Sequence, residues 1–322
     1  MLPIHFAMHL PDGFLSVQVS IFMWLATVPV IGYALKRLNA DLGERQVPMM
    51  GVLAAAIFAG QMLNFAIAGG TSGHLIGAAM ATILLGPWAA MLVLTCVISI
   101  QALLFQDGGL LVLGTNIFNM AIVGVAVAYM VFRTVHRLTG ERSWGLYAGG
   151  FLAAWTSVEV AALGTGLELS LSGTSPANIA IPAMGGIHVL IGIGEGLITI
   201  GALVFLNATR RDLIKTNTAA QPKGNWVWVA GLILALLLAV ASPLASKHPD
   251  GLISVAQHYG FLSNEKNPLF SLIPHYVFPG IGDKTLATIL AAILGTLIVF
   301  GVTLGVAYTR RRRSGSDDQQ QV

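Results

Sequence analysis

Long apolar runs separated by short polar segments make up most of this 322-residue chain. Because a helix needs roughly 20 apolar residues to cross a hydrocarbon core about 30 Å thick, the pattern predicts about nine transmembrane helices. The predicted spans lie near residues 14–35, 48–68, 75–86, 88–105, 110–132, 144–163, 179–206, 226–244 and 286–308. The longest polar stretch between the first eight spans follows the seventh. We therefore expect an all-α integral membrane protein built from a seven-helix module and a two-helix module.

The predicted organisation has four parts. The first module occupies residues 8–208, and a polar, turn-rich linker follows at 209–225. The second module occupies residues 226–309 and contains a large external loop at 245–285. The tail at 310–322 begins with four arginines and then has the polar composition of a disordered segment. The chain thus resembles two membrane modules joined into one polypeptide.

Composition excludes several classes of protein. Hydrophobic residues account for 55% of the chain and charged residues for only 10%, which is far from the composition of a soluble domain. The single cysteine, Cys96, excludes both a disulfide framework and a zinc site built from cysteines. The net charge of +3 comes from short basic clusters between apolar runs. Such clusters orient a membrane protein, so they do not indicate a nucleic-acid partner.

The distribution of basic residues predicts the orientation in the membrane. Four segments hold 14 of the 17 Lys and Arg residues, namely 36–45, 133–142, 210–223 and 310–313. Since basic loops are enriched on the cytoplasmic side, these segments should be cytoplasmic. We therefore expect a multi-pass protein of the cell membrane with its N-terminus outside and its C-terminus in the cytoplasm.

The pair Met8 and His9 lies immediately before the first apolar run. If the mature chain begins at Met8, the free amine, the next amide nitrogen and the His9 ring can chelate one ion in a plane. Such a nitrogen set suits nickel, copper, cobalt or zinc better than calcium or magnesium. If Met1 is the first residue of the mature chain, His9 is an ordinary imidazole ligand. We favour Met8, and the turn at 11–13 then folds this segment back over the first helix.

A second candidate ligand ends the glycine-rich segment 69–74. Non-helical backbone at membrane depth occurs where it is buried in protein or lines a cavity. The segment is therefore expected to fold inward and to present His74, which then opens the short third span. One chelating Met8–His9 pair and one imidazole would complete four-coordination of a metal ion. The alternative is a structural histidine that forms a hydrogen bond at a helix start.

Ionisable residues inside predicted spans are expensive and are functional candidates by default. His188 and Glu195 lie seven residues apart on one predicted helix, and therefore on one face. They are candidates for a proton relay, for a second metal site or second shell, or for a structural pair. The first two alternatives leave open an ion-coupled secondary transporter or channel that uses His188 and Glu195.

Several motifs resemble one family in their order along the chain. Segments 8–15, 70–75, 101–109, 114–120 and 186–196 are similar to the cobalt/nickel substrate-binding membrane component of ECF transporters, the CbiM/NikM type. The resemblance implies a seven-helix substrate-binding S component that holds Ni²⁺, or Co²⁺, through Met8, His9 and His74. The ion is then cargo, and no cofactor is implied. The extension before Met8 departs from the family pattern.

The second module resembles a small partner of such systems. Residues 226–308 are similar to the NikN or PDGLE type, which implies a role in loading or releasing metal, and its loop histidines His248, His258 and His275 are candidate transient ligands. No Gly-x-x-x-x-Gly-Lys-Ser/Thr phosphate loop occurs in the chain. The resemblance implies that a separate transmembrane coupling subunit and ATP-binding subunits supply the energy. We therefore expect a transporter component and not an enzyme.

Overall fold

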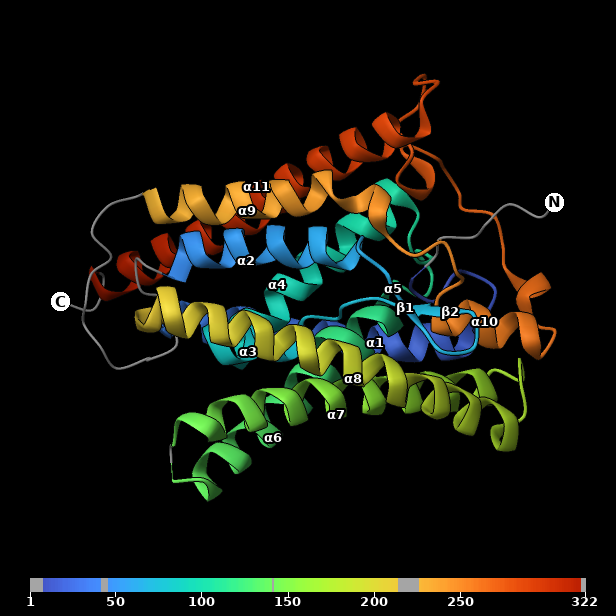
Figure 1. Ribbon diagram of the computed structural model, residues 1–322, viewed down its shortest axis with the longest axis horizontal. Coiled ribbons are helices and arrows are strands. Elements are labelled where there is room, and N and C mark those ends of the chain that lie inside the picture. Colours follow the sequence, from blue (N-terminus) through green and yellow to red (C-terminus); the bar gives the residue numbers. More distant parts are fainter. Residues whose placement is uncertain (1–7, 42–45, 141, 214–225, 320–322) are drawn as a thin grey trace.

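The structure is a computed structural model that describes residues 8–41, 46–140, 142–213 and 226–319. Helices account for most of these residues (Figure 1). The α-helices are α1 (Val17–Asp41), α2 (Gln46–Gln61), α3 (Ala78–Leu85), α4 (Pro87–Ile100), α5 (Leu113–Asn116), α6 (Gly124–Leu138), α7 (Ser143–Leu171), α8 (Ala177–Thr209), α9 (Trp226–Val240), α10 (Gly251–His258) and α11 (Lys284–Gln319). Two π-helices, η1 (Gln101–Phe105) and η2 (Ile117–Val123), and two strands, β1 (Phe65–Ile67) and β2 (Thr71–Gly73), complete the fold with the short 3-10 turns Arg211–Leu213, Ser242–Leu244, Leu262–Asn264 and Pro274–Tyr276.

Six helices in the described part of the chain are long and apolar enough to cross a membrane. They are Val17–Leu38, Pro87–Phe105, Leu113–Leu138, Ser143–Leu171, Ala177–Thr209 and Lys284–Arg311. Gln46–Gln61 and Trp228–Val240 form shorter apolar helices, and α3 has only 8 residues. These lengths show a multi-pass membrane protein, and the third predicted span is indeed short.

The structure differs from the sequence prediction at four places. The span predicted at 48–68 ends at Gln61, and a β-hairpin replaces its last residues, because Gly69 and Gly70 take positive φ angles of 84° and 75° in the turn. Helix α7 continues through most of the loop predicted at 164–178. The large loop of the second module contains a helix, α10. Helix α11 reaches Gln319 and so includes most of the tail at 310–322.

Glycines allow the long helices to pack closely. Helices α7 and α8 lie side by side (Figure 1), where Gly192 faces Trp155 and Gly196 faces Phe151. Helices α9 and α11 both pack on α2. The second module is therefore in direct contact with the first. Residues 214–225 of the predicted linker lie outside the described residues.

The segment between α9 and α11, residues 241–283, also contacts the first module at the end of the molecule that carries the hairpin. Backbone amides of this segment donate to carbonyl oxygens of the first module: Ser246 to Asn64 at 2.8 Å and Lys266 to Asp12 at 2.8 Å. In the opposite direction, the Ser72 amide donates to the Pro249 carbonyl at 2.9 Å. These bonds place the 241–283 segment over the residues that the sequence singled out.

Candidate metal site

The segment from Met8 to Leu10 is buried between two loops. Side chains of Met8 and His9 are only 6% and 2% exposed. The Leu10 amide donates to the Asn116 side-chain oxygen at 3.1 Å, and the Asn116 amide group donates back to the Leu10 carbonyl at 3.1 Å. The Gly109 amide also donates to the Leu10 carbonyl, at 2.9 Å. The start of the described chain is therefore held in one place.

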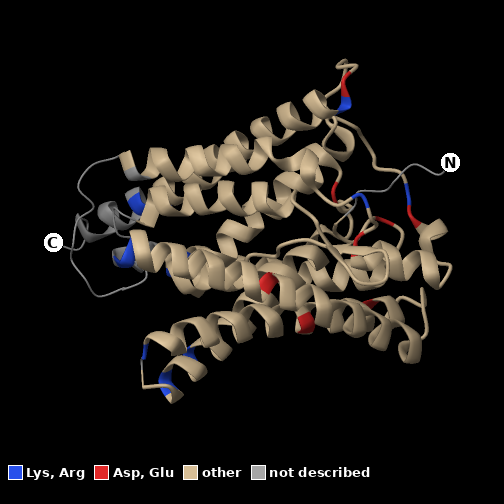
Figure 2. Ribbon diagram, viewed as in Figure 1, with Lys and Arg blue, Asp and Glu red and all other residues tan. Residues whose placement is uncertain are grey.

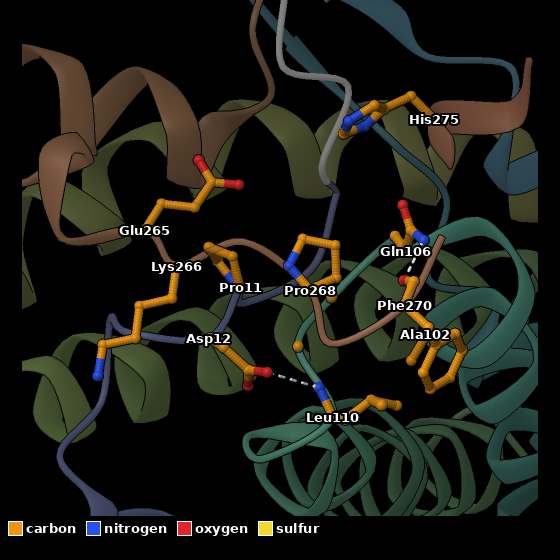
Figure 3. Close-up of a pocket in the computed structure, with 12 residues that line it drawn as sticks. Pro11, Asp12, Ala102, Gln106, Leu110, Glu265, Lys266, Pro268, Phe270 and His275 are labelled. Atoms are coloured by element: carbon orange, nitrogen blue, oxygen red, sulfur yellow. Dashed lines mark hydrogen bonds between the residues drawn. The ribbon is translucent and has the colours of Figure 1, made fainter. Parts of the chain in front are cut away.

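The turn after this segment is fixed by Asp12. Its carboxylate accepts hydrogen bonds from the amides of Leu110, Leu111 and Val112 at 3.1, 2.9 and 3.2 Å, just before α5 begins. Figure 3 shows the bond to Leu110 beside a small cavity of about 40 Å³. The amides at a helix start have no partner within the helix, and a carboxylate is a strong acceptor for them. Asp12 is therefore an anchor for the Met8–His9 segment.

Three nitrogens of this segment lie close to Asp107. Its Oδ1 atom accepts from the Met8 nitrogen at 2.7 Å and from the His9 nitrogen at 3.3 Å, while His9 Nδ1 lies 3.2 Å from the Asp107 carbonyl oxygen and 3.4 Å from Oδ1. The other ring nitrogen of His9, Nε2, is buried and has no hydrogen-bond partner among the described residues. The donors that sequence reasoning grouped for chelation thus point to one place.

The hairpin brings His74 to the same site. The rings of His9 and His74 lie 5.5 Å apart, centroid to centroid, at an angle of 86°. His74 follows strand β2, and the two backbone amides after its neighbour Leu75 are bound by a carboxylate from α8: Glu195 accepts from Ile76 and Gly77 at 2.8 Å each. This double contact fixes the loop that carries His74.

A carboxylate from the second module binds the His74 ring. Asp250 Oδ1 lies 3.0 Å from His74 Nδ1. Asp250 also forms a parallel β-bridge with Ser72, and the Ser72 hydroxyl donates to the His248 carbonyl at 2.9 Å. The second module therefore extends the hairpin and supplies the partner of its histidine. With Nδ1 as the donor to Asp250, Nε2 carries the free electron pair.

The site encloses a cavity of about 60 Å³, large enough for a small ion or a water molecule. Its polar lining comes from both modules and includes Asn116, Asn119 and Thr165 together with the residues His9, His74, His188 and Asp250. In the part of the chain that the structure describes, no group of three or more His, Cys, Asp or Glu side chains forms a ready metal site.

Charge interactions shift two pKa values at the site. Burial alone would lower the pKa of His74, but the charge and hydrogen bond of Asp250 outweigh it, so the pKa is raised above 6.5. Burial alone would raise the pKa of Asp107, but the nearby His9 and the hydrogen bonds from Tyr276 and Met8 outweigh it, so the pKa is lowered. Asp107 is accordingly an anion in the folded chain.

The two α8 residues that the sequence predicts as a pair, His188 and Glu195, have different contacts. His188 lines the cavity and its Nδ1 lies 2.7 Å from the Met184 carbonyl. Glu195 is fully buried and binds the loop after His74. Among the described residues no hydrogen bond joins His188 to Glu195, so the relay alternative has no direct link. The loop histidines His248, His258 and His275 do not line the cavity.

Sequence reasoning missed three residues of the site, Asp107, Asp250 and Tyr276. The Tyr276 hydroxyl donates to Asp107 Oδ2 at 2.6 Å. A signal for Asp250 was present, since Pro-Asp-Gly occurs both at 11–13 and at 249–251. Both aspartates bind the first module, one through backbone amides and one through a histidine. No local pattern marks Tyr276.

Two parts of the chain match known protein families. Residues 9–213 match the CbiM family, described as the cobalt uptake substrate-specific transmembrane region, and residues 225–312 match the PDGLE domain. A putative fused nickel transport protein NikMN of Archaeoglobus fulgidus is 38% identical over 310 residues, covering 95% of this chain and 100% of that protein. The fused nickel transport protein NikMN of Rhodobacter capsulatus is 33% identical over 247 residues, covering 70% of this chain and 71% of that protein.

Solved structures show the same likeness. A truncated transition metal transporter is 38% identical to this chain with a TM-score of 0.56. The match covers 62% of this chain and 99% of the transporter's chain. A second transition metal transporter is 34% identical to this chain with a TM-score of 0.57. The match covers 70% of this chain and 99% of that transporter's chain.

Proposed function

Because the chain belongs to the CbiM family of cobalt uptake substrate-specific transmembrane regions, we propose that it captures nickel, or cobalt, for an ATP-driven importer of the ECF type. The observation that carries the proposal is the meeting of the Met8–His9 segment with His74 in one buried cavity. Two segments separated by more than 60 residues bring nitrogen donors to this point, and the carboxylates of Asp107 and Asp250 flank them. That chemistry suits a divalent transition metal.

The proposed ligands are the Met8 and His9 nitrogens, the His9 ring and the His74 ring. The carboxylate of Asp250 orients His74, as carboxylates commonly orient metal-binding histidines. The metal ion is the cargo, so the site has to release it as well as bind it. His188 lines the same cavity and is proposed as a residue of the second shell.

Nickel is the preferred cargo in this proposal. The relative that covers 95% of this chain is named as a putative fused nickel transport protein, and one that covers 70% as a fused nickel transport protein, while a relative that covers 64% is a cobalt transport protein CbiM of Sorangium cellulosum. A nitrogen-rich site also binds nickel more tightly than cobalt in the general affinity order of divalent metals. Cobalt remains the alternative cargo.

We further propose nine membrane segments, seven in the first module and two in the second. Basic residues gather at the end of the molecule opposite the hairpin (Figure 2). By the positive-inside rule that end is cytoplasmic, so the metal site faces outside and the C-terminus is cytoplasmic. The proposed modules are residues 8–208 and 226–309, joined by the linker 209–225. A tethered second module is held at high effective concentration beside the first.

The energy for import is proposed to come from partner proteins, a transmembrane coupling subunit and ATP-binding subunits. The absence of a phosphate-loop motif from the sequence supports this division of labour. If the chain were instead an ion-coupled secondary transporter or channel, metal uptake would continue in cells that lack the ATP-binding partners. Loss of uptake in such cells is the result we expect.

Calorimetry with the purified chain and Ni²⁺ tests the binding site directly. We expect tight binding by the natural chain and no tight binding by His74→Ala. His258→Ala is the matched control, because His258 lies in the second module away from the cavity. Equal nickel affinity of the natural chain and His74→Ala would remove His74 from the ligand set and overturn the proposed site.

A further inference from the structure

A carboxylate oxygen stands at the point where the three nitrogens of the Met8–His9 segment converge. Asp107 Oδ1 is 2.7 to 3.4 Å from the Met8 nitrogen, the His9 nitrogen and His9 Nδ1. These groups are buried, and a buried N–H group without an acceptor is costly. Asp107 supplies these acceptors, through its carboxylate for the two backbone nitrogens and through its carbonyl oxygen for His9 Nδ1 at 3.2 Å.

The same three nitrogens are ligands in the proposed function. An ion bound to all three has to lie on the side toward which they point, and Asp107 Oδ1 occupies that side. A hydrogen bond uses the proton on the nitrogen, whereas a metal ion replaces that proton or uses a free electron pair. The carboxylate and the ion therefore cannot hold these nitrogens at the same time.

The second module holds the other oxygen of this carboxylate. The Tyr276 hydroxyl donates to Asp107 Oδ2 at 2.6 Å, and both side chains are buried. Burial and the charge of Asp107 raise the pKa of Tyr276 well above its ordinary value, so the hydroxyl keeps its proton. The Tyr276 ring stacks on Phe105 with centroids 4.7 Å apart and planes 13° from parallel. Tyr276, a residue of the second module, thus holds the Asp107 carboxylate in place.

Backbone strain gathers around this contact. Among the described residues, positive φ angles at non-glycine positions occur at Gln106 (56°), His275 (53°) and Tyr276 (58°). Gln106 precedes Asp107, and its side chain donates to the Phe270 carbonyl of the 241–283 segment (Figure 3). Such a left-handed conformation is strained for a residue with a side chain and persists only where the surroundings hold it. All three strained positions therefore adjoin the Asp107–Tyr276 contact. Gln106 precedes Asp107, His275 precedes Tyr276, and Tyr276 itself forms the contact.

We propose that Asp107 is an internal competitor of the metal ion, and that Tyr276 gives the second module control of it. The carboxylate accepts from the Met8 and His9 backbone nitrogens, and it has to leave them for an ion to bind there. As the ion departs, the carboxylate returns and favours release. The proposal rests on the proposed function, because it takes the same nitrogens as ligands.

The test is a Tyr276→Phe variant of the full chain, which keeps the ring on Phe105 and removes only the hydroxyl. Loss of a hydrogen bond to a charged group should destabilise the empty site, so nickel affinity should rise and nickel release to a chelator should slow, each by roughly tenfold. Tyr259→Phe is the control, since Tyr259 is 46% exposed in the same module. Unchanged or weakened nickel binding by Tyr276→Phe, with the control like the natural chain, would overturn the proposal.

A second measurement separates a competitor from a ligand and does not depend on how Tyr276→Phe folds. The X-ray absorption spectrum of nickel bound to Asp107→Asn should match that of the natural chain, because Asp107 leaves the ion. Loss of an oxygen neighbour of nickel in this variant would make Asp107 a ligand and end the proposal. If the natural chain binds no nickel at all, the proposed function and this inference both fail; if it binds nickel and only the tyrosine result is contrary, the inference alone fails.

Discussion

Asp250 Oδ1 lies 3.0 Å from His74 Nδ1, although the two residues are 176 positions apart and belong to different modules. A carboxylate on one ring nitrogen fixes the tautomer and the orientation of the ring, and it raises the basicity of the other nitrogen. The second module therefore contacts a proposed ligand of the first module. We expect the PDGLE part of the chain to orient His74 through this contact.

The Asp250→Asn variant tests this role. Asparagine keeps the size of the side chain but loses the charge, so the His74 ring should be held less firmly. We expect nickel affinity to fall by roughly 10- to 100-fold, the usual cost of losing such a partner, in calorimetry with the purified chain. The control is Asp283→Asn, because the Asp283 side chain accepts from the Leu286 amide at the start of α11, at 2.9 Å. An unaltered affinity in Asp250→Asn would contradict the orienting role.

Glu195 is expected to support the His74 loop and not to relay protons. Glu195→Gln replaces one acceptor oxygen with an NH₂ group that faces a backbone N–H of Ile76 or Gly77. The unmet donor should lower the free energy of unfolding by about 1–3 kcal/mol and weaken nickel binding, as measured by thermal unfolding and calorimetry. Glu159→Gln is the control, since the Oε2 atom of Glu159 has no described partner. Retained stability together with lost uptake would favour the relay instead.

Two glycines offer a matched test of how the N-terminal segment docks. Gly13 and Gly69 have φ angles of 96° and 84°, so alanine is strained at both. A Cβ atom at Gly13 would lie 2.0 Å from the Asn264 carbonyl oxygen, whereas a Cβ atom at Gly69 would meet nothing within 4 Å. Gly13→Ala should therefore displace the 241–283 segment and reduce nickel affinity more than tenfold, while Gly69→Ala changes it little. Equal losses in the two variants would show that backbone strain alone matters.

The sequence predicts a mostly helical, multi-pass membrane protein, and it singles out His9 and His74, whose rings the structure brings within 5.5 Å, because both signals are local. An apolar run identifies a membrane span without any knowledge of the residues that pack against it. His9 beside Met8, and His74 at the end of a glycine-rich segment, can likewise be recognised from the adjacent residues. The hairpin was missed because Phe65 and Ile67 are apolar and extend the hydropathy of the preceding helix. Asp107 and Tyr276 were missed because their roles depend on partners 98 and 169 positions away. Contacts at that distance come from packing, which periodicity does not record.

The nitrogen of Met8 should bind nickel better as a terminal amine than as an amide inside a longer chain. Its position 2.7 Å from Asp107 Oδ1, beside the His9 nitrogens, places it at the site. A chain that begins at Met8 should therefore bind nickel at least tenfold more tightly than the chain that begins at Met1, and adding one Gly before Met8 should reverse the gain. Intact-mass measurement of the protein from its own membrane should show which start is used. Equal affinities for the three forms would exclude the amine as a ligand.

Metal binding should weaken as the pH falls, and Asp250 should set where the loss begins. A ligand histidine has to be neutral, so a proton on His74 competes with the ion. The pKa of His74 is raised above 6.5 because the charge and hydrogen bond of Asp250 outweigh the effect of burial. Nickel affinity should thus be full well above this raised pKa and decline as the pH drops through it.

The Asp250→Asn variant lacks the charge that raises the pKa of His74. Its decline in nickel affinity should therefore begin at a lower pH, even though its affinity at high pH is smaller. Calorimetric titrations with Ni²⁺ across pH 5 to 8 would measure both curves, and a decline at the same pH in the two proteins would show that Asp250 does not control the protonation of His74.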